Sequence, residues 1–308
     1  MIAVLGAGAF GAALALAVGS DVRLWGRGLA PGARQSTRLP GAAFPDRVTV
    51  VATREDALKG AEIVLLAVPM AALRDVAAEL DFGARTVIAC CKGIDPDTLA
   101  GPSRVLLDAG IAAPGVLTGP SFAADIARGL PTALTLALAD AGAARAAQAA
   151  LSSSTLRIYT SPDVRGAELG GALKNVLAIG AGAVVGAGLG QSAQAALLTR
   201  GFAEIRELAA AEADPATLVG LSGLGDLMLT AFSDQSRNFR YGVALGAGED
   251  LPTGLTVEGV ATARAVARIA RDRGLDLPVL SATEALISGT LTPRAAVEAL
   301  MSRPLKEE

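Results

Sequence analysis

Residues 1–17, MIAVLGAGAFGAALALA, contain the pattern that decides the fold of this chain. An apolar run, IAVL, leads directly into Gly6, Gly8 and Gly11, and an alanine- and leucine-rich segment follows. This order is typical of a strand, a tight turn and a helix, which is the context in which G-x-G-x-x-G binds a dinucleotide. Gly6 would permit the tight turn, and Gly11 would allow the helix to pack closely against the strand. Gly8 would let a pyrophosphate approach the backbone and the free N–H groups of the helix N-terminus.

Short apolar runs recur through the first half of the chain and alternate with helical patterns. Fully apolar strands that alternate with helices indicate a parallel sheet covered on both faces. The sequence therefore predicts an α/β fold whose N-terminal part is a Rossmann-type, doubly wound, mainly parallel sheet. The predicted strands are 2–5, 22–25, 63–68, 86–91, 115–118 and 132–138, and helices are expected between most of them, including 71–80 and 141–151.

From about residue 165 the strand signals fade and helical patterns take over. Ser and Pro interrupt the pattern at YTSPD (159–163), so the boundary is expected there. This divides the chain into an NAD(P)-binding domain, 1–161, and an all-α substrate domain, 162–308. The predicted helices of the second domain are 165–188, 193–212, 258–273, 278–288 and 293–302.

Composition excludes several classes of protein. The net charge is −3 and like charges form no long run, so no nucleic-acid or membrane-surface partner is expected. The apolar run 176–190 is too short and too rich in glycine to span a bilayer. The N-terminus lacks a basic segment and is interpreted as a strand rather than a signal peptide. Cys90 and Cys91 are adjacent, and neighbours rarely pair, so reduced thiols and a cytoplasmic location are expected.

The chain has no histidine. This excludes histidine-based acid/base pairs, Ser-His-Asp triads and almost every zinc site, so no metal is expected. In an enzyme of this composition, a lysine, carboxylate, tyrosine or cysteine must move the proton.

Cofactor preference depends on the residue that follows the second strand. An acid there would bond the ribose 2′-hydroxyl and favour NAD. The sequence instead has RLWGRG, which places Arg27 at that position. Arginine suits a 2′-phosphate, so NADP(H) is favoured, with NAD(H) also possible; an exposed loop arginine is the plainer interpretation.

Lys174 lies in an apolar stretch, where burial of its charge would be unfavourable. It is the only charged residue between Glu168 and Arg200, in GGALKNVLAIGAGAVVGAGLG (170–190). Burial can lower a lysine pKa by about 3–5 units, so packing alone would favour leucine. At helical spacing Lys174 shares a face with small residues, which lets a helix or a ligand approach, and Asn175 adds an amide. The lysine either reaches solvent along the helix start or lines a cleft where it exchanges a proton.

Three further stretches carry polar groups. ACCKGI (89–94) places Lys92 at the carboxyl end of a strand, where ligands bind in open α/β sheets. LTGPSFA (117–123) places Ser121 near a helix start. Residues 222–242 hold a dense polar cluster in which an arginine beside a serine and an asparagine could bind phosphate; its members are Asp226, Thr230, Ser236, Arg237 and Asn238. Each feature could equally be a cap, a turn or a surface pair.

Taken together, these stretches resemble the bacterial-type NAD(P)-dependent glycerol-3-phosphate dehydrogenases. The resemblance covers nearly the whole chain, in GAGAFG, FPD (44–46), CKG, GPSFA, GGALKNVLAIGAG, SGLGDLMLT, QSRNFRYG and VEG (257–259). It implies a Rossmann-type domain followed by a helical substrate domain. It departs at Met70, where many relatives have serine, and in the short, basic loop 26–41.

The resemblance also implies roles. Lys174 would be the general acid/base between dihydroxyacetone phosphate and sn-glycerol 3-phosphate, Lys92 would stabilise the reacting oxygen, and Asp226 would orient both lysines. Substrate contacts would come from Lys92, Gly119, Ser121, Lys174, Asp226, Ser236, Arg237 and Asn238. Cofactor contacts would come from Gly6, Gly8, Ala9, Phe10, Gly11, Arg27, Lys92, Ala123, Arg237, Thr256 and Glu258. A homodimer that supplies glycerol 3-phosphate for glycerophospholipid synthesis is implied as well.

Three other classes are weighed against this interpretation. A β-hydroxyacid-type dehydrogenase acting on a small carboxylate has the same plan, but the SRN cluster and the CKG lysine argue against it. Short-chain dehydrogenases need Y-x-x-x-K, which neither tyrosine satisfies. A non-catalytic nucleotide sensor would need the three glycines but not Lys92, Lys174 and Asp226. The presence of all three residues argues against a sensor.

Overall fold

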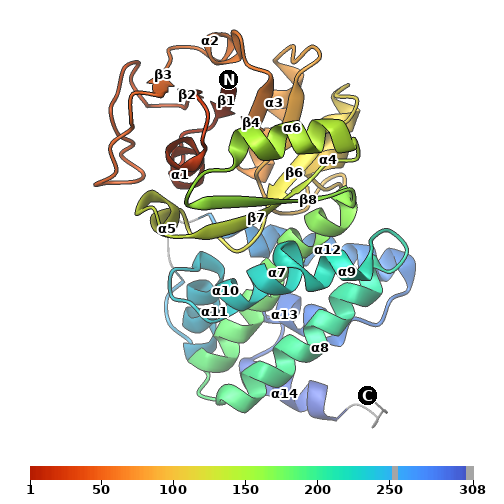
Figure 1. Cartoon of the computed structure of the whole chain (residues 1–308). Helices are drawn as coiled ribbons and strands as arrows, with labels where there is room; N and C mark the ends of the chain where they lie inside the picture. The colour runs from red at the N-terminus through yellow and green to blue at the C-terminus, as the bar shows by residue number, and fades with distance from the viewer. Residues whose placement is uncertain (252–255, 303–308) are drawn as a thin grey trace.

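The computed structural model describes residues 1–251 and 256–302. Eight strands and six helices form a sheet region, β1–β8 with α1–α6, and the helices that follow form a helical region, α7–α14 (Figure 1). β8 ends at Ser161 and α7 begins at Val164, so the predicted boundary falls between them. The predicted span 162–308 includes residues 252–255 and 303–308, which lie outside the described residues.

The eight strands form one sheet in the order β3-β2-β1-β4-β5-β6-β7-β8. Every neighbouring pair is parallel except β6 and β7, which confirms a mainly parallel sheet. The strands are β1 Ile2–Leu5, β2 Val22–Trp25, β3 Val48–Val50, β4 Ile63–Leu66, β5 Thr86–Ala89, β6 Gly115–Thr118, β7 Thr132–Ala137 and β8 Leu156–Ser161.

Two strands, β3 and β8, were not predicted, and both are edge strands. Their side chains alternate between buried and exposed, as in Leu156, Arg157 and Ile158 of β8. The central strands are buried on both faces and therefore form continuous apolar runs, whereas an edge strand covered on one face does not. The predicted runs 63–68 and 86–91 also continue past the strand ends, because apolar residues line the loops there.

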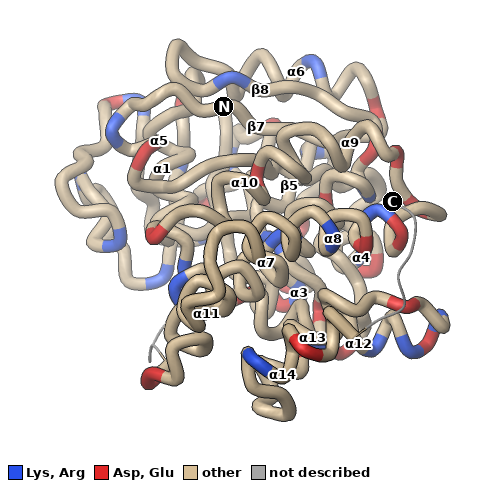
Figure 2. The backbone as a smooth tube through the Cα atoms, turned by 90° about the horizontal axis from the view of Figure 1, so that it is seen from below, with Lys and Arg blue, Asp and Glu red and all other residues tan. Residues whose placement is uncertain are grey.

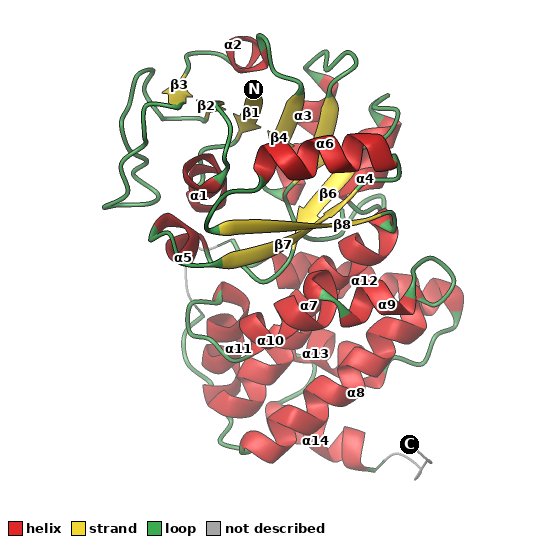
Figure 3. Cartoon of the chain, in the orientation of Figure 1, coloured by secondary structure: helices red, strands yellow, loops and turns green. Residues whose placement is uncertain are grey.

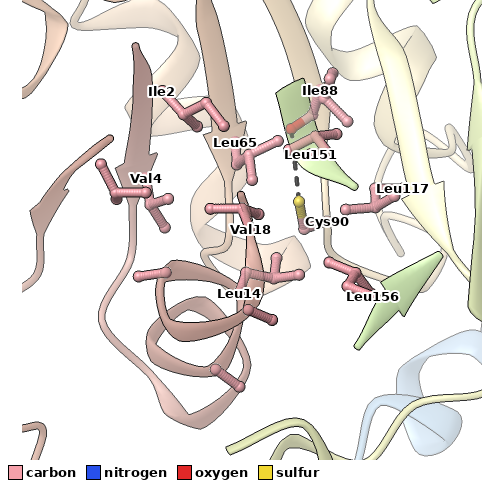
Figure 4. Close-up of a cluster of buried hydrophobic side chains, with 14 of the residues drawn as sticks. Ile2, Val4, Leu14, Val18, Leu65, Ile88, Cys90, Leu117, Leu151 and Leu156 are labelled. Carbon is pink, nitrogen blue, oxygen red and sulfur yellow. Dashed lines mark hydrogen bonds between the residues drawn. The ribbon is translucent and has the colours of Figure 1, made fainter. Parts of the chain in front are cut away.

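Helices cover both faces of the sheet (Figure 3). They are α1 Ala9–Ala17, α2 Arg54–Leu58, α3 Met70–Ala78, α4 Pro102–Asp108, α5 Ala123–Ala127 and α6 Ala141–Leu151. Side chains of α1 and α6 pack on one sheet face with Val4, Leu65 and Leu117 (Figure 4). A second cluster, including Leu66 and Leu73, fills the opposite face. Cys90 and Cys91 are buried and unpaired, and burial raises the pKa of Cys90 to about 12, which makes it unreactive.

The helical region consists of α7 Val164–Gly186, α8 Gln191–Ala209, α9 Pro215–Val219, a π-helical turn η1 Leu221–Gly225, α10 Asp226–Ala231, α11 Arg237–Ala247, α12 Glu258–Arg273, α13 Pro278–Ile287 and α14 Pro293–Met301. The five predicted helices agree with α7, α8, α12, α13 and α14 to within three residues at each end. The short helices α9 and α10, the turn η1 and the eleven-residue helix α11 were not predicted. Helices α9 and α10 have only five and six residues, too few to show a helical period, and α11 begins within a polar stretch.

Helix α7 is the centre of the helical region. Its glycines allow a close crossing with α11, because a Cβ on Gly182 or Gly186 would collide with α11 backbone. By length and composition alone α7 could cross a membrane, but 89% of its most apolar window is buried inside the protein, as in a core helix. Basic and acidic residues are interspersed over the chain around it (Figure 2).

Candidate active site

The glycine turn occupies the carboxyl end of β1, at the centre of the sheet. Gly6 has a left-handed backbone (φ 116°), and a Cβ there would collide with the carbonyl of Ala67. A Cβ on Gly11 would collide with the carbonyl of Gly6, so these two glycines are required by packing. Gly8 differs, because nothing lies within 4 Å of the position of its Cβ. Its exposed backbone is where a ligand can approach.

The N-terminus of α1 is available to an anion. Gly8 is its N-cap, no side chain caps the helix, and its first turn holds no acidic residue. Free N–H groups at a helix start suit a pyrophosphate. Ala9, Phe10 and Ala123, the first residue of α5, pack against one core cluster beside this turn. These residues fit a dinucleotide.

Arg27 is exposed and follows β2, next to the glycine turn. The two are close because Gly26 packs against Ala7 so tightly that a Cβ on Gly26 would collide with Ala7. The guanidinium of Arg27 forms no ion pair with any described residue of the chain. It is therefore free to bind an anion at the ribose end of a dinucleotide.

Three side chains that are far apart in the sequence meet at one carboxylate. Lys92 follows β5, Lys174 lies on α7, and Asp226 is the first residue of α10. Lys92 Nζ donates to Asp226 Oδ2 (2.6 Å), and Lys174 Nζ donates to Asp226 Oδ1 (2.9 Å). Lys174 Nζ also donates to Thr230 Oγ1 (2.6 Å), one turn along α10. We call Lys92, Lys174 and Asp226 the lysine–aspartate cluster.

Burial gives this cluster unusual electrostatics. Lys174 is 7% exposed and Asp226 is 1% exposed. Burial lowers the pKa of Lys174 to about 8, with a contribution from the ammonium of Lys92, while Asp226 acts in the opposite direction. Burial by itself would raise the pKa of Asp226, but the two ammonium groups hold it below its usual value. Lys174 can thus exchange a proton near neutral pH, and Asp226 stays ionised.

Asn175 presents a donor without a partner. Asn238 Nδ2 donates to Asn175 Oδ1 (2.8 Å), and the backbone N–H of Gly259 donates to Asn238 Oδ1 (3.0 Å). These bonds fix the orientation of the Asn175 amide. Its Nδ2 is buried and has no hydrogen-bond partner in the described structure. A buried orphan donor next to Lys174 is suited to a ligand oxygen.

The predicted phosphate cluster is divided in the structure. Ser236 is buried and caps α11, where its Oγ accepts from the N–H of Phe239 (3.2 Å). Asn238 is committed to Asn175 and Gly259. Arg237 is exposed in the first turn of α11, and its charge acts on the carboxyl of Glu258. Among these neighbours, Arg237 is the one with a free cation for phosphate.

The other predicted residues surround the same edge of the sheet. The carbonyl of Gly119 accepts from Lys92 Nζ (3.1 Å) and from Ser121 Oγ (3.2 Å). Thr256 is exposed just before α12, and Glu258 is the first residue of α12. Burial raises the pKa of Glu258, although the cations of Arg237, Lys92 and Lys174 oppose this. Glu258 therefore lies near both lysines.

One residue at this edge, Thr118, was not picked out from the sequence. Thr118 ends β6, and its buried Oγ1 has no partner in the described structure. A Cβ on Gly171 would lie 2.6 Å from that Oγ1 and 3.7 Å from Lys92 Cγ, so Thr118 borders the cluster. The available signal was a polar residue at the end of an apolar strand. Met70, where the resemblance departs, contacts Cys91 through sulfur (3.9 Å) and lines Gly93.

The arrangement as a whole suits hydride transfer to or from a carbonyl carbon. The glycine turn and the lysine–aspartate cluster lie at the carboxyl ends of β1 and β5, with only β4 between these strands. In open α/β sheets this edge binds the ligand. The buried Lys174 is able to exchange a proton, and a second cation, Lys92, faces it across Asp226. Among the described residues, no group of three His, Cys, Asp or Glu side chains could hold a metal ion.

Comparisons with known proteins agree along the whole chain. Residues 1–144 match the family model for the N-terminus of NAD-dependent glycerol-3-phosphate dehydrogenase, and residues 163–298 match the model for its C-terminus. The chain is 55% identical to a glycerol-3-phosphate dehydrogenase [NAD(P)+] of Cereibacter sphaeroides, over 100% of both chains. It is 53% identical to the protein of the same name from Paracoccus denitrificans, over 100% of this chain and 99% of that one.

A solved structure supports the same relationship. The crystal structure of a glycerol-3-phosphate dehydrogenase from Coxiella burnetii superposes with a TM-score of 0.90, at 32% identity, over 98% of each chain. The similarity therefore extends over the sheet region and the helical region together.

Proposed function

The chain belongs to the NAD-dependent glycerol-3-phosphate dehydrogenase family, and from that premise we propose that it interconverts dihydroxyacetone phosphate and sn-glycerol 3-phosphate with NAD(P)H. The observation that carries the proposal is the lysine–aspartate cluster, which is placed at the sheet edge that also holds the glycine turn. The bound nicotinamide would supply or accept the hydride. The protein must position the substrate and move one proton.

Lys174 is the proposed general acid/base. In the reductive direction C2 of dihydroxyacetone phosphate receives hydride, and Lys174 Nζ gives its proton to the carbonyl oxygen. In the oxidative direction neutral Lys174 takes the hydroxyl proton as hydride leaves C2. The lowered pKa of about 8 places both protonation states within reach. Asp226 and Thr230 each accept a hydrogen bond from the Lys174 ammonium, and together they fix its position.

Lys92 is proposed to stabilise negative charge on the reacting oxygen. Its Nζ is held between Asp226 and the carbonyl of Gly119, at the end of two adjacent strands. Because this cation is already in place and little water surrounds it, the site does not have to rearrange as charge develops on the oxygen. The orphan Nδ2 of Asn175 is proposed to donate to a substrate oxygen beside Lys174.

We assign binding of the substrate's phosphate group to Arg237. The guanidinium binds phosphate by paired, charge-assisted hydrogen bonds. Ser236, Gly119 and Ser121 are kept as proposed substrate neighbours. Asn238 is proposed to contribute mainly through the Asn175 amide, because its own side chain is already bonded.

Cofactor binding is assigned to the glycine turn, with Ala9, Phe10, Ala123, Lys92, Arg237, Thr256 and Glu258 around it. Arg27, exposed and without an ion pair, is proposed to favour the 2′-phosphate of NADP(H), while NAD(H) is also accepted.

Several wider properties belong to the same proposal. We propose a dinucleotide domain of residues 1–161 and a substrate domain of residues 162–308. We also propose a cytoplasmic homodimer whose glycerol 3-phosphate enters glycerophospholipid synthesis. Sedimentation of the purified protein would test the dimer.

The test of the function is the initial rate of NADPH and NADH oxidation with dihydroxyacetone phosphate. Small 2-keto acids serve as control substrates. Saturable turnover on the phosphate ester alone is expected. Turnover on a keto acid, without activity on the phosphate ester, would instead assign the chain to a β-hydroxyacid-type reaction.

A further inference from the structure

The loop that follows Lys92 lies between the sheet region, where Asp95 pairs with Arg74 of α3 (3.3 Å), and the core of the helical region. Ile94, which is 3% exposed, belongs to the hydrophobic cluster built mainly from α7, α8, α12 and α13. Leu99 packs against the same cluster. The segment directly after Lys92 is therefore attached to the helices on which Lys174 and Asp226 are carried.

The backbone of this loop is held in a strained form. Leu99 has a left-handed conformation (φ 58°), which a non-glycine residue adopts only when its surroundings impose it. Asp95 supplies that constraint, since its carboxylate accepts from the N–H groups of Asp97 (3.1 Å) and Thr98 (2.9 Å). Its carbonyl accepts from the N–H of Leu99 (2.9 Å). These hydrogen bonds fix the conformation of residues 95–99, between Lys92 and the start of α4.

At the start of α4 the loop is fastened to α7 by one buried carboxylate. Glu168 of α7 is 3% exposed, and its Oε1 accepts from the backbone N–H of Ser103 (2.7 Å). Ser103 Oγ donates to the same carboxylate (3.0 Å to Oε2). A Cβ on Gly101 would collide with this carboxyl group, so the fit is close. We call the Glu168–Ser103 contact the clamp.

The clamp is tied further into the helical region by charge. Arg165 Nη1 lies 3.0 Å from Glu168 Oε2, and Arg165 Nε lies 2.7 Å from Glu212. Arg273, at the end of α12, pairs with Glu212 (2.6 Å). A buried carboxylate requires such a partner. The ion pairs thus run from Arg165 and Glu168 of α7 through Glu212 to α12, and the hydrogen bonds of Ser103 connect α4 to them.

We propose that Glu168 is a positioning residue that holds Lys92 against Asp226, by clamping the loop after Lys92 to helix α7. Lys92 is then fixed on both sides, by β5 before it and by the clamped loop after it. The effect on turnover rests on the function proposed above, whereas the effect on the geometry of the cluster does not. Glu168 itself forms no bond to the cluster, so it acts through Lys92.

Displacement of Lys92 would change the pKa of Lys174 in a predictable direction. The ammonium of Lys92 contributes to the lowered pKa of Lys174, after burial. If the clamp is weakened and Lys92 moves away, the pKa of Lys174 rises, because a repelling cation is lost and Asp226 is left to Lys174 alone. The direct effect of removing a carboxylate would be the opposite, since a lost negative charge lowers a lysine pKa. A rise therefore reports displacement of Lys92.

The chain offers a matched control in Glu204. This residue is also buried (6% exposed), and its carboxylate also caps a helix, accepting from the N–H groups of Val279 (2.7 Å) and Leu280 (2.9 Å) at the start of α13. Both Glu204 and α13 lie within the helical region. Burial raises the pKa of Glu204 to about 7, so its carboxylate is mostly ionised where Lys174 titrates. Glu204→Gln therefore removes a buried, helix-capping carboxylate without touching the loop after Lys92.

The experiment measures the titration of Lys174 without substrate. The sequence has four lysines, Lys59, Lys92, Lys174 and Lys306, so acetylation by acetic anhydride at a series of pH values can be followed for each by mass spectrometry. The full-length wild type, Glu168→Gln, Ser103→Ala and Glu204→Gln are compared. Rates with dihydroxyacetone phosphate and NADPH are measured in parallel.

For Glu168→Gln we expect the Lys174 midpoint to rise by about half a unit or more, and kcat to fall by about tenfold with little change in the KM for NADPH. Ser103→Ala keeps every charge and should shift the midpoint in the same direction by less. Glu204→Gln should leave it unchanged. If Glu168→Gln does not fold, Ser103→Ala decides the question.

A Lys174 midpoint that is unchanged or lowered in both clamp variants would overturn the proposal. An equal rise in Glu204→Gln would also overturn it, because the effect would then be general loosening. Absence of turnover in the wild type would contradict the proposed function and leave the labelling test of the clamp intact.

Discussion

The glycine turn and the lysine–aspartate cluster lie at the same edge of the sheet, yet they are built in different ways. The turn is made of backbone from one short segment, and its shape is required by collisions that a Cβ on Gly6 or Gly11 would cause. The cluster is made of side chains from the loop after β5, from α7 and from α10, which are separated by many residues. The first can be recognised from local sequence, and the second exists only when the chain is folded.

The two regions also differ in what they hold. The turn offers neutral N–H groups to an anion and carries no charge of its own. The cluster brings three charges together, two of them buried and that of Lys92 partly buried, and the pKa of Lys174 is the result of burial opposed by Asp226. Binding and proton transfer should therefore separate when each region is changed alone, and the predictions below test that separation.

The largest effect is expected for Lys174→Ala. Loss of the general acid/base should lower kcat by about 10³-fold. Affinity for NADPH should remain within a few-fold of wild type, because the glycine turn is untouched. Single-turnover rates and NADPH fluorescence titration measure the two quantities. A variant that loses cofactor affinity but keeps its kcat at saturation would contradict the separation.

The next effect concerns the turn itself. Gly11→Ala should destabilise the protein by about 2–3 kcal/mol, since its Cβ would meet the carbonyl of Gly6 and the backbone would have to shift. Gly8→Ala is the matched control, because its Cβ enters open space. Urea denaturation should show Gly8→Ala close to wild type in stability, with weaker NADPH binding. Equal loss of stability in both variants would refute the distinction.

The pH dependence should reveal the cluster. Oxidation of glycerol 3-phosphate needs neutral Lys174, so kcat should rise about tenfold per pH unit up to a midpoint near 8 and then level off. Reduction of dihydroxyacetone phosphate needs the protonated form, so its kcat should be level below that midpoint and fall above it. Rates in both directions at constant ionic strength test this. Parallel profiles in the two directions would exclude Lys174 as the titrating group.

The smallest effect is expected at Arg27. Arg27→Ala should reduce kcat/KM for NADPH by about tenfold, the equivalent of one charge-assisted contact of about 1.4 kcal/mol. The value for NADH should hardly change, since NADH lacks the 2′-phosphate. Steady-state kinetics with each cofactor measure the ratio. An equal loss with both cofactors would mean that Arg27 contacts a part that they share.

Much of the fold was available from local patterns. The central strands are continuous apolar runs, and α6 and α12 were predicted with the bounds that the structure has, because their amphipathic periods are clear. The edge strands β3 and β8 and the helix α11 were missed. The strands are buried on one side only. Helix α11 is amphipathic, but it begins within the polar stretch 233–242, and Gly242 and Gly246 lie on its face toward α7.

The site shows the same division. The sequence singled out Lys92, Lys174 and Asp226 as polar residues in unusual surroundings. Their spacing could not show that both lysines donate to the carboxylate of Asp226. It also offered no signal for Glu168 of α7, whose partner Ser103 lies 65 residues away. The burial of Thr118 and the orphan donor of Asn175 likewise became visible only once neighbouring elements were placed.

The parallel sheet, the glycine turn and the absence of histidine chemistry follow from the amino-acid sequence alone. Strand period and backbone sterics are properties of short segments, and composition is a property of the whole chain. The position of Asp226 between two lysines, the lowered pKa of Lys174 and the contact of Glu168 with Ser103 follow from the folded chain. Electrostatic coupling and burial depend on distances through space, and the fold sets those distances.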